Sequence, residues 1–229
     1  TAQDFVTQAN EAIHEIAGRG VIPIICGGTG FYIDALVGRV PLPNVAADPT
    51  FRKQLDEATV GELFVKLERT DPRRARTIDK FNKRRLIRSI EIARALGRSP
   101  RPTQTNRYDV LWIGLHLAPE ELRVRINRRL RERLKPARSG RYVRAGRGMI
   151  AEAKRLHKSG LSYKRMYDLG LEYRSLSRFL QGKIDRKELE SELKIAIWHY
   201  ARRQISYWKR NKEIRWFAPS QVNQMEQSI

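Results

Sequence analysis

The apolar residues at the start of the chain recur at helical spacing and then give way to a short continuous apolar run. A first helix is predicted because one face would carry the apolar residues Phe5, Ala9, Ala12, Ile13 and Ile16. Gly18 and Gly20 end it. The run Val21–Cys26 predicts a buried strand, and a second helix is predicted over Phe31–Leu36. The order helix, strand, glycine turn, helix indicates an α/β fold with a parallel sheet.

The middle of the chain is patterned as helix and carries many cations. Asp48-Pro49 is a start signal, with aspartate as the cap and proline in the first turn. A second start signal lies at Asp71-Pro72, and the helical pattern continues to about Leu96. We therefore predict that residues 44–107 form a helical insertion with a basic face.

The pattern changes again at Tyr108–Leu117, which returns to strand character with Val110, Leu111, Trp112, Ile113 and Leu115. Helices are predicted from Pro119, over Met149–His157 and over Leu169–Leu180. A long last helix has an apolar stripe made of Leu189, Leu193, Ile197, Ala201, Ile205 and Trp208. A final strand is predicted over Ile214–Phe217. Residues 1–43 and 108–229 are therefore expected to form an α/β core with C-terminal helices.

Charge narrows the classes of ligand. The 229 residues contain 46 Lys and Arg against 25 Asp and Glu, a formal net charge of +21. A charge of that size favours a polyanionic partner, with nucleic acid ahead of an anionic membrane surface. A hydrophobic content of 41% argues against disorder, and a single cysteine, Cys26, excludes an internal disulfide framework. A reducing, cytoplasmic setting fits, and the apolar runs are too short to span a bilayer.

The most specific local motif is Cys26-Gly27-Gly28-Thr29-Gly30, between the predicted strand and helix. Ligands of open α/β sheets bind beyond the carboxyl ends of the strands, where glycines let a phosphate approach the backbone. The Thr29 hydroxyl would then donate to a phosphate oxygen. The same residues also fit an ordinary strand-to-helix turn capped by Thr29. The sequence contains no phosphate-binding loop of the form G-x-x-x-x-G-K-[ST].

Three basic motifs allow both a functional and a structural interpretation. Arg84 and Arg88 share one helix face and suit phosphates, or else Arg88 pairs with Glu91. Arg174 would bind a diphosphate with both ends of its guanidinium, or else pairs with Glu172. The segment 202–210 mixes cations with aromatics, which suits RNA, although Trp208 also continues the apolar stripe. The four histidines have no metal-ligand spacing, so we expect any Mg²⁺ to arrive with a diphosphate substrate.

Taken in order, these motifs resemble the tRNA dimethylallyltransferase (tRNA isopentenyltransferase) family from Phe5 to about Phe217. The similar stretches are Arg19–Leu36, Asp48-Pro49, Asn82–Glu91, Gly170–Arg174 and Ala201–Ile205. The resemblance implies a P-loop NTPase-like α/β core that carries a helical insertion. It also implies transfer of a dimethylallyl group from dimethylallyl diphosphate to N6 of the adenine 3′ to the anticodon (position 37), a base that is flipped into a channel.

The resemblance also implies roles for individual residues. Thr29 and Arg174 would be catalytic and, with Gly27 and Gly28, would bind the diphosphate as charge grows on the leaving oxygen. The tRNA anticodon stem-loop would be contacted by Arg52, Arg84, Arg85, Arg88, Tyr173, Arg202, Arg203, Gln204 and Lys209. We expect a monomeric protein that does not bind membranes.

The chain departs from the family pattern in two places. The family's phosphate-binding loop and general-base aspartate would precede Thr1, so we expect this polypeptide to be inactive, or nearly so, by itself. Lys135–Arg147 resembles an insertion that is either an extra RNA-contacting arm or a disordered basic loop. A non-catalytic RNA-binding module on the same scaffold also explains the charge. A small-molecule kinase-like P-loop protein explains the core but not the basic helices.

Overall fold

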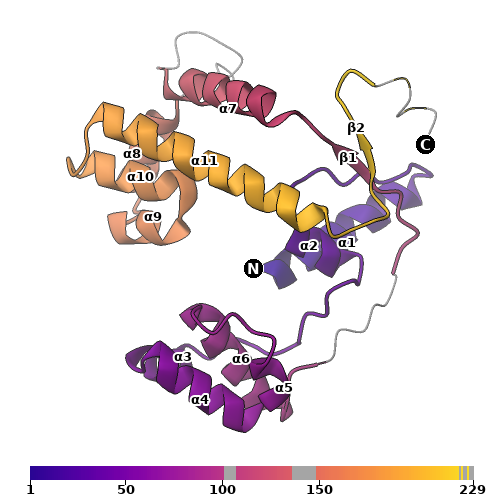
Figure 1. Ribbon diagram of the computed structural model, residues 1–229, viewed down its shortest axis with the longest axis vertical. Coiled ribbons are helices and arrows are strands. Elements are labelled where there is room, and N and C mark those ends of the chain that lie inside the picture. The colour runs from indigo at the N-terminus through magenta and orange to yellow at the C-terminus, as the bar shows by residue number, and fades with distance from the viewer. Residues whose placement is uncertain (101–106, 136–147, 222, 224–225, 227–229) are drawn as a thin grey trace. The chain divides into compact units, whose positions relative to one another are not determined.

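The computed structural model describes residues 1–100, 107–135, 148–221, 223 and 226. They form two compact units, Thr1–Val110 and Leu111–Ile229 (Figure 1). Most of the predicted basic insertion, including Arg138, Arg141, Arg144 and Arg147, lies outside the described residues. The predicted division into a core and an insertion of residues 44–107 stays a prediction.

The first unit contains helices alone among the described residues. A pair packs through Val6, Ala35 and Leu36, and Phe5 lies 5.3 Å from Tyr32 between ring centroids. Four more helices enclose a separate apolar cluster that includes Leu63, Leu67, Leu86 and Ile90. The helices of the unit are α1 (Ala2–Gly18), α2 (Gly30–Leu36), α3 (Pro49–Glu57), α4 (Val60–Thr70), α5 (Pro72–Ala75) and α6 (Lys83–Leu96).

Both predicted start signals are confirmed as helix caps. The Asp48 carboxylate accepts the backbone N–H of Phe51, with Pro49 in the first turn of α3. Asp71 caps α5 in the same way by accepting the N–H of Arg74, and its carboxylate also accepts the N–H of Ser99. These hydrogen bonds satisfy first-turn donors that the helix itself leaves without partners.

The predicted strand Val21–Cys26 is wrong. The segment has no regular secondary structure and is not part of a sheet, and Ile22 and Ile24 are 78% and 82% exposed. A strand forms only where a neighbour supplies a ladder of hydrogen bonds, and no such neighbour runs beside it within the described ranges. Pro23 also removes one donor. The local apolar pattern could not reveal that the neighbouring strand, which a sheet requires, would be missing beside this segment among the described residues.

The second unit consists of helices and a small sheet. Its elements are β1 (Ile113–Leu115), α7 (Pro119–Leu134), α8 (Met149–Lys158), α9 (Tyr163–Leu169), α10 (Leu171–Leu180), α11 (Arg186–Trp208) and β2 (Arg215–Phe217). β1 and β2 are parallel, with Gly114 opposite Trp216. A Cβ at Gly114 would lie 2.5 Å from the Trp216 ring, so glycine permits this approach. The predicted strand Tyr108–Leu117 is therefore much shorter than expected.

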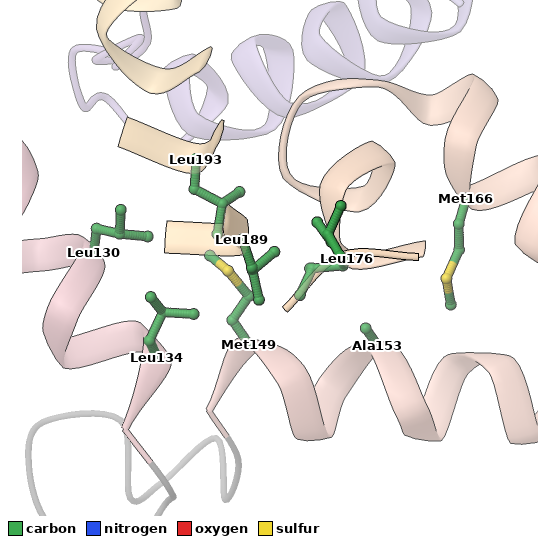
Figure 2. Packing of buried hydrophobic residues seen from close by; sticks show 9 residues of the cluster. Leu130, Leu134, Met149, Ala153, Met166, Leu176, Leu189 and Leu193 are labelled. Carbon is green, nitrogen blue, oxygen red and sulfur yellow. The ribbon is translucent and has the colours of Figure 1, made fainter. Parts of the chain in front are cut away.

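The core of the second unit lies where α8, α9 and α10 gather around one end of α11 (Figure 1). Figure 2 shows Leu189 and Leu193 of α11 facing Leu130 and Leu134 of α7, with Met149 of α8 beside them. The first two positions of the predicted stripe on α11 are thus fully buried. Its later positions are half-buried, and Trp208 packs against Trp112 with 5.6 Å between ring centroids.

Candidate functional site

Thr29 stands at the N-cap position of α2, in an exposed turn. Its carbonyl accepts the N–H of Tyr32, but its hydroxyl does not bond to the first turn of the helix. The expected capping hydrogen bond of an ordinary turn is therefore not made. Gly27 has ordinary space for a Cβ, which would lie 3.7 Å from the Ile33 side chain. The close approach of a ligand at Gly27 and Gly28 stays a prediction.

Arg174 lies in the first half of α10 and its side chain is exposed. Its Nε donates to the carbonyl of Tyr167 at 3.4 Å, and its guanidinium carbon lies 4.8 Å from the centre of the Tyr167 ring. In the part of the chain that the structure describes, no carboxylate is within ion-pair distance of Arg174. The guanidinium is thus held from one side by an aromatic ring while keeping donors for an anion.

The alternative pairing of Arg174 with Glu172 is wrong. Glu172 instead forms a two-fold hydrogen-bonded ion pair with Arg133 of α7, in which Nη2 and Oε2 are 2.8 Å apart. Both side chains are about three-quarters buried, and the pair ties α10 to α7. Because Glu172 is occupied by Arg133, its neighbour Arg174 is left for another role.

The corner between α9 and α10 has an unusual backbone. Gly170 has φ 77° and ψ −165°, a combination that is essentially confined to glycine. The next residue, Leu171, has φ 41°, which a branched side chain rarely adopts. This corner aims the first turn of α10, where Arg174 is located. Its backbone strain, on the order of 1–3 kcal/mol, is typical of residues that hold a functional geometry.

Tyr173 connects the same turn to the core of the second unit. Its hydroxyl donates to Glu152 of α8 at 2.7 Å, and its ring packs against the buried cluster. Burial first, and then the Glu152 carboxylate, raises the pKa of Tyr173 to about 12. The ring therefore fixes α10 against α8, and its predicted contact with tRNA stays a prediction.

Arg52 and Arg88 both bind one buried carboxylate in the first unit. Glu91 accepts hydrogen bonds from Arg52 (Nε at 3.0 Å and Nη2 at 2.7 Å), from Arg88 and from the backbone N–H of Asp48. Arg88 also donates to the carbonyl of Val45 at 2.9 Å. The structural alternative for Arg88 is therefore confirmed. Its predicted contact with tRNA, like that of Arg52, stays a prediction.

The Glu91 network has a consequence for acid stability. Burial by itself raises the pKa of Glu91, but the hydrogen bonds from Arg52, Asp48 and Arg88 outweigh it and hold the pKa at about 2, against an ordinary 4.5. A lowered folded-state pKa stabilises the protein above the unfolded-state pKa, and this contribution is lost as the pH falls toward 2. Chemical unfolding should therefore show the advantage of the wild type over Glu91→Gln shrinking from about pH 6 to about pH 3. An advantage that stays constant over this range would contradict the assignment, and Glu68→Gln, on an exposed position of α4, is the control.

The remaining predicted RNA contacts lie on exposed or half-exposed positions. Arg84 and Arg85 are exposed in the first turn of α6. Arg202, Arg203 and Lys209 are exposed on α11 or at its end, and Gln204 is half-buried. The guanidinium of Arg203 lies 5.8 Å from the ring centre of Tyr200, and that of Arg210 lies 4.3 Å from that of Tyr207.

Comparison with known proteins decides the family. A model of the IPP transferase family matches residues 1–211. The chain belongs to the IPP transferase family. It is 34% identical over 199 residues to tRNA dimethylallyltransferase 2 of Citrifermentans bemidjiense, covering 87% of this chain and 61% of that protein. It is 31% identical to tRNA dimethylallyltransferase 1 of Syntrophus aciditrophicus, covering 99% and 72%.

Solved structures agree with this membership of the IPP transferase family. The crystal structure of the full-length tRNA isopentenylpyrophosphate transferase of Bacillus halodurans superimposes with a TM-score of 0.62 at 29% identity, over all of this chain and 71% of that one. A eukaryotic dimethylallyltransferase acting on tRNA has a TM-score of 0.75 at 20% identity, and supports the fold alone. The chain spans about three fifths of the length of several curated relatives in the IPP transferase family.

Within this IPP transferase chain the predicted catalytic residues lie in different units, Thr29 in the first and Arg174 in the second. Their convergence on one diphosphate therefore stays a prediction. Sequence reasoning missed Tyr167 and Arg133, which hold Arg174 and Glu172. Tyr167 and Arg174 are seven residues apart, a spacing that places two residues on the same face of a continuous helix. Gly170 breaks the helix between them, so this spacing did not indicate their contact. Arg133 is remote in sequence, so only the folded chain reveals it.

Two further features of this family member concern metal ions and membranes. Among the described residues no group of three or more His, Cys, Asp or Glu side chains is placed to hold a metal ion. No helix in the described ranges is long and apolar enough to cross a bilayer.

Proposed function

We propose that this chain supplies part of the active site and the RNA-binding surface of a tRNA dimethylallyltransferase built on a P-loop NTPase-like core. The reaction would form a C–N bond between the dimethylallyl group and N6 of the adenine 3′ to the anticodon, break the C–O bond to diphosphate, and release a proton from N6. Membership of the family and the printed names of its relatives support this reaction class.

The observation that carries the proposal is the state of Arg174. A guanidinium that rests on the Tyr167 ring and has no carboxylate partner among the described residues is ready to bind an anion. Diphosphate matches the fork of donors on arginine, and negative charge grows on the ester oxygen of its α-phosphate as the C–O bond breaks. Thr29, with Gly27 and Gly28, would contact the same diphosphate from the first unit, and Mg²⁺ would enter bound to that substrate.

The net charge of +21 equally favours a second candidate, a non-catalytic RNA-binding module on the same scaffold. Incubating the chain with dimethylallyl diphosphate, Mg²⁺ and an anticodon stem-loop RNA, followed by mass spectrometry of the nucleosides, separates the two. Prenylated adenosine would establish the enzyme, whereas salt-sensitive binding without product would leave the binding module. The monomeric state and cytoplasmic setting remain part of the proposal.

The RNA-binding part of the proposal predicts a specific salt dependence. Arg84 and Arg85 are exposed, and the described residues place no carboxylate within ion-pair distance of either. Replacing both by alanine should weaken binding of an anticodon stem-loop and reduce the slope of log affinity against log salt concentration by about 1 for each arginine. Fluorescence anisotropy over a salt series measures this slope.

The matched control replaces two lysines of the second unit, Lys183 and Lys187, which are exposed near the start of α11. This pair removes the same charge from a different surface. A slope that falls equally in both double variants would show that only net charge matters, and would contradict specific contacts by Arg84 and Arg85.

A further inference from the structure

The first unit has a highly exposed aromatic side chain. Phe81 lies in the turn between α5 and α6 and is 79% exposed. A phenylalanine ring that stays in water forgoes the favourable free energy of burying its large apolar surface. An exposed position of this kind therefore calls for an explanation. The position immediately precedes Asn82, whose side chain caps α6 by accepting the N–H of Arg85.

The usual structural role of an apolar residue in this position does not apply. A residue just before a helix cap often packs on the fourth residue of the helix, as a hydrophobic staple. The fourth residue of α6 is Leu86, which is completely buried. The half-buried side chains that pack against its cluster are Phe51, Ala58, Val60, Phe64 and Ile78, and Phe81 is not among them. The ring therefore does not stabilise the start of the helix.

The turn nevertheless holds Phe81 in a defined place. The Asp79 carboxylate accepts the backbone N–H of Phe81 at 3.2 Å, and the Asp79 carbonyl accepts the N–H of Asn82 at 3.1 Å. The Asn82 cap then connects the turn to α6. A ring displayed from an ordered backbone loses less conformational freedom when it binds a ligand.

Positively charged residues flank Phe81 along the sequence. The Nζ of Lys80 lies 5.3 Å from the centre of the Phe81 ring. On the other side, Lys83 is held by the Asp56 carbonyl and carboxylate, while Arg84 and Arg85 are exposed. The one acid of the turn, Asp79, is engaged with the backbone of Phe81. An isolated aromatic ring flanked by positive charges suits a nucleobase that is flanked by phosphates.

We propose that Phe81 is a stacking platform for an unpaired RNA base, with Lys80, Arg84 and Arg85 contacting the adjoining phosphates. The proposal rests on the RNA binding proposed above and adds to it a subsite that recognises the face of a base. Stacking on an aromatic ring tolerates any base, because every base has a π face. The platform would therefore select unpaired over paired RNA rather than one sequence over another.

The test compares three variants of the full chain on two RNAs, an anticodon stem-loop hairpin and a fully paired duplex of equal length. Phe81→Ala should bind the hairpin about tenfold more weakly than the wild type. Its salt slope should be unchanged, because no phosphate contact is lost. Phe81→Leu should lose as much, since leucine keeps apolar bulk without a π face, and Phe81→Trp should bind at least as tightly as the wild type. Affinity for the duplex should be the same for all.

Val65→Ala is the matched control, because Val65 is an apolar residue of the same bundle that is 45% exposed. It should leave hairpin binding unchanged. Wild-type hairpin affinity in Phe81→Ala or Phe81→Leu, an equal loss on the duplex, or a lowered midpoint of thermal unfolding in Phe81→Ala would each overturn the platform. If the wild type binds neither RNA, the proposed RNA binding falls as well. If the wild type binds the hairpin with a steep salt dependence and Phe81→Ala does not weaken this binding, only the stacking platform is contradicted and the proposed RNA binding stands.

Discussion

Replacing Arg174 by alanine is expected to lower turnover by about 10²- to 10³-fold, because the leaving diphosphate loses a donor that strengthens as charge develops. The measurement compares the wild-type and variant proteins in the same prenylation assay. Prenylation of an anticodon stem-loop under saturating substrate gives turnover, and anisotropy gives RNA affinity.

RNA affinity should fall little in the Arg174→Ala variant, which separates a role in the reaction from a role in binding. Arg174→Lys should restore only part of the turnover, since a lysine keeps the charge but not the planar fork that matches diphosphate. Arg178→Ala is the control on the same helix, because Arg178 pairs with Glu192 instead of facing an anion. Full turnover in Arg174→Ala would remove this residue from the active site.

Replacing Glu91 by alanine is expected to destabilise the first unit by about 3 kcal/mol. The side chain is 4% exposed, and its removal would leave Arg52, Arg88 and the N–H of Asp48 without their shared acceptor. The backbone N–H of Asp48 would also lose its hydrogen bond to α6, and Arg88, which donates to the carbonyl of Val45, would lose its carboxylate partner. The free energy of unfolding in urea measures the loss.

Glu91→Gln should cost less than Glu91→Ala, because the amide oxygen still accepts some of the hydrogen bonds while the charge is absent. Glu68→Ala, on an exposed position of α4, should change stability by less than about 0.5 kcal/mol. If Glu91→Ala were as stable as the wild type, the network would not hold this unit together, and Arg52 and Arg88 would be freer to bind RNA than the geometry indicates.

Local signals in the sequence located most of the helices, because their causes are local. Asp48 and Asp71 cap helices through donors three residues away, and the repeat that contains Leu189 and Leu193 places the buried face of α11. The sheet was harder to predict from the sequence. A strand such as β1 exists because Trp216, about a hundred residues later, lies beside Gly114. The apolar run at Val21–Cys26 forms no strand because no such neighbour lies beside it in the part of the chain that the structure describes.

The candidate site divides in the same way between what the sequence and the tertiary structure decide. The order and spacing of the motifs were sufficient to place the chain in its family and to single out Thr29 and Arg174, since these are properties of the linear pattern. Only the folded structure shows which carboxylate or aromatic ring each arginine contacts. Glu91 takes Arg52 and Arg88, and Glu172 takes Arg133, so Arg174 rests on Tyr167 with its anion-binding donors kept. Ion pairs form between side chains that meet in space, and the sequence alone does not specify which side chains meet.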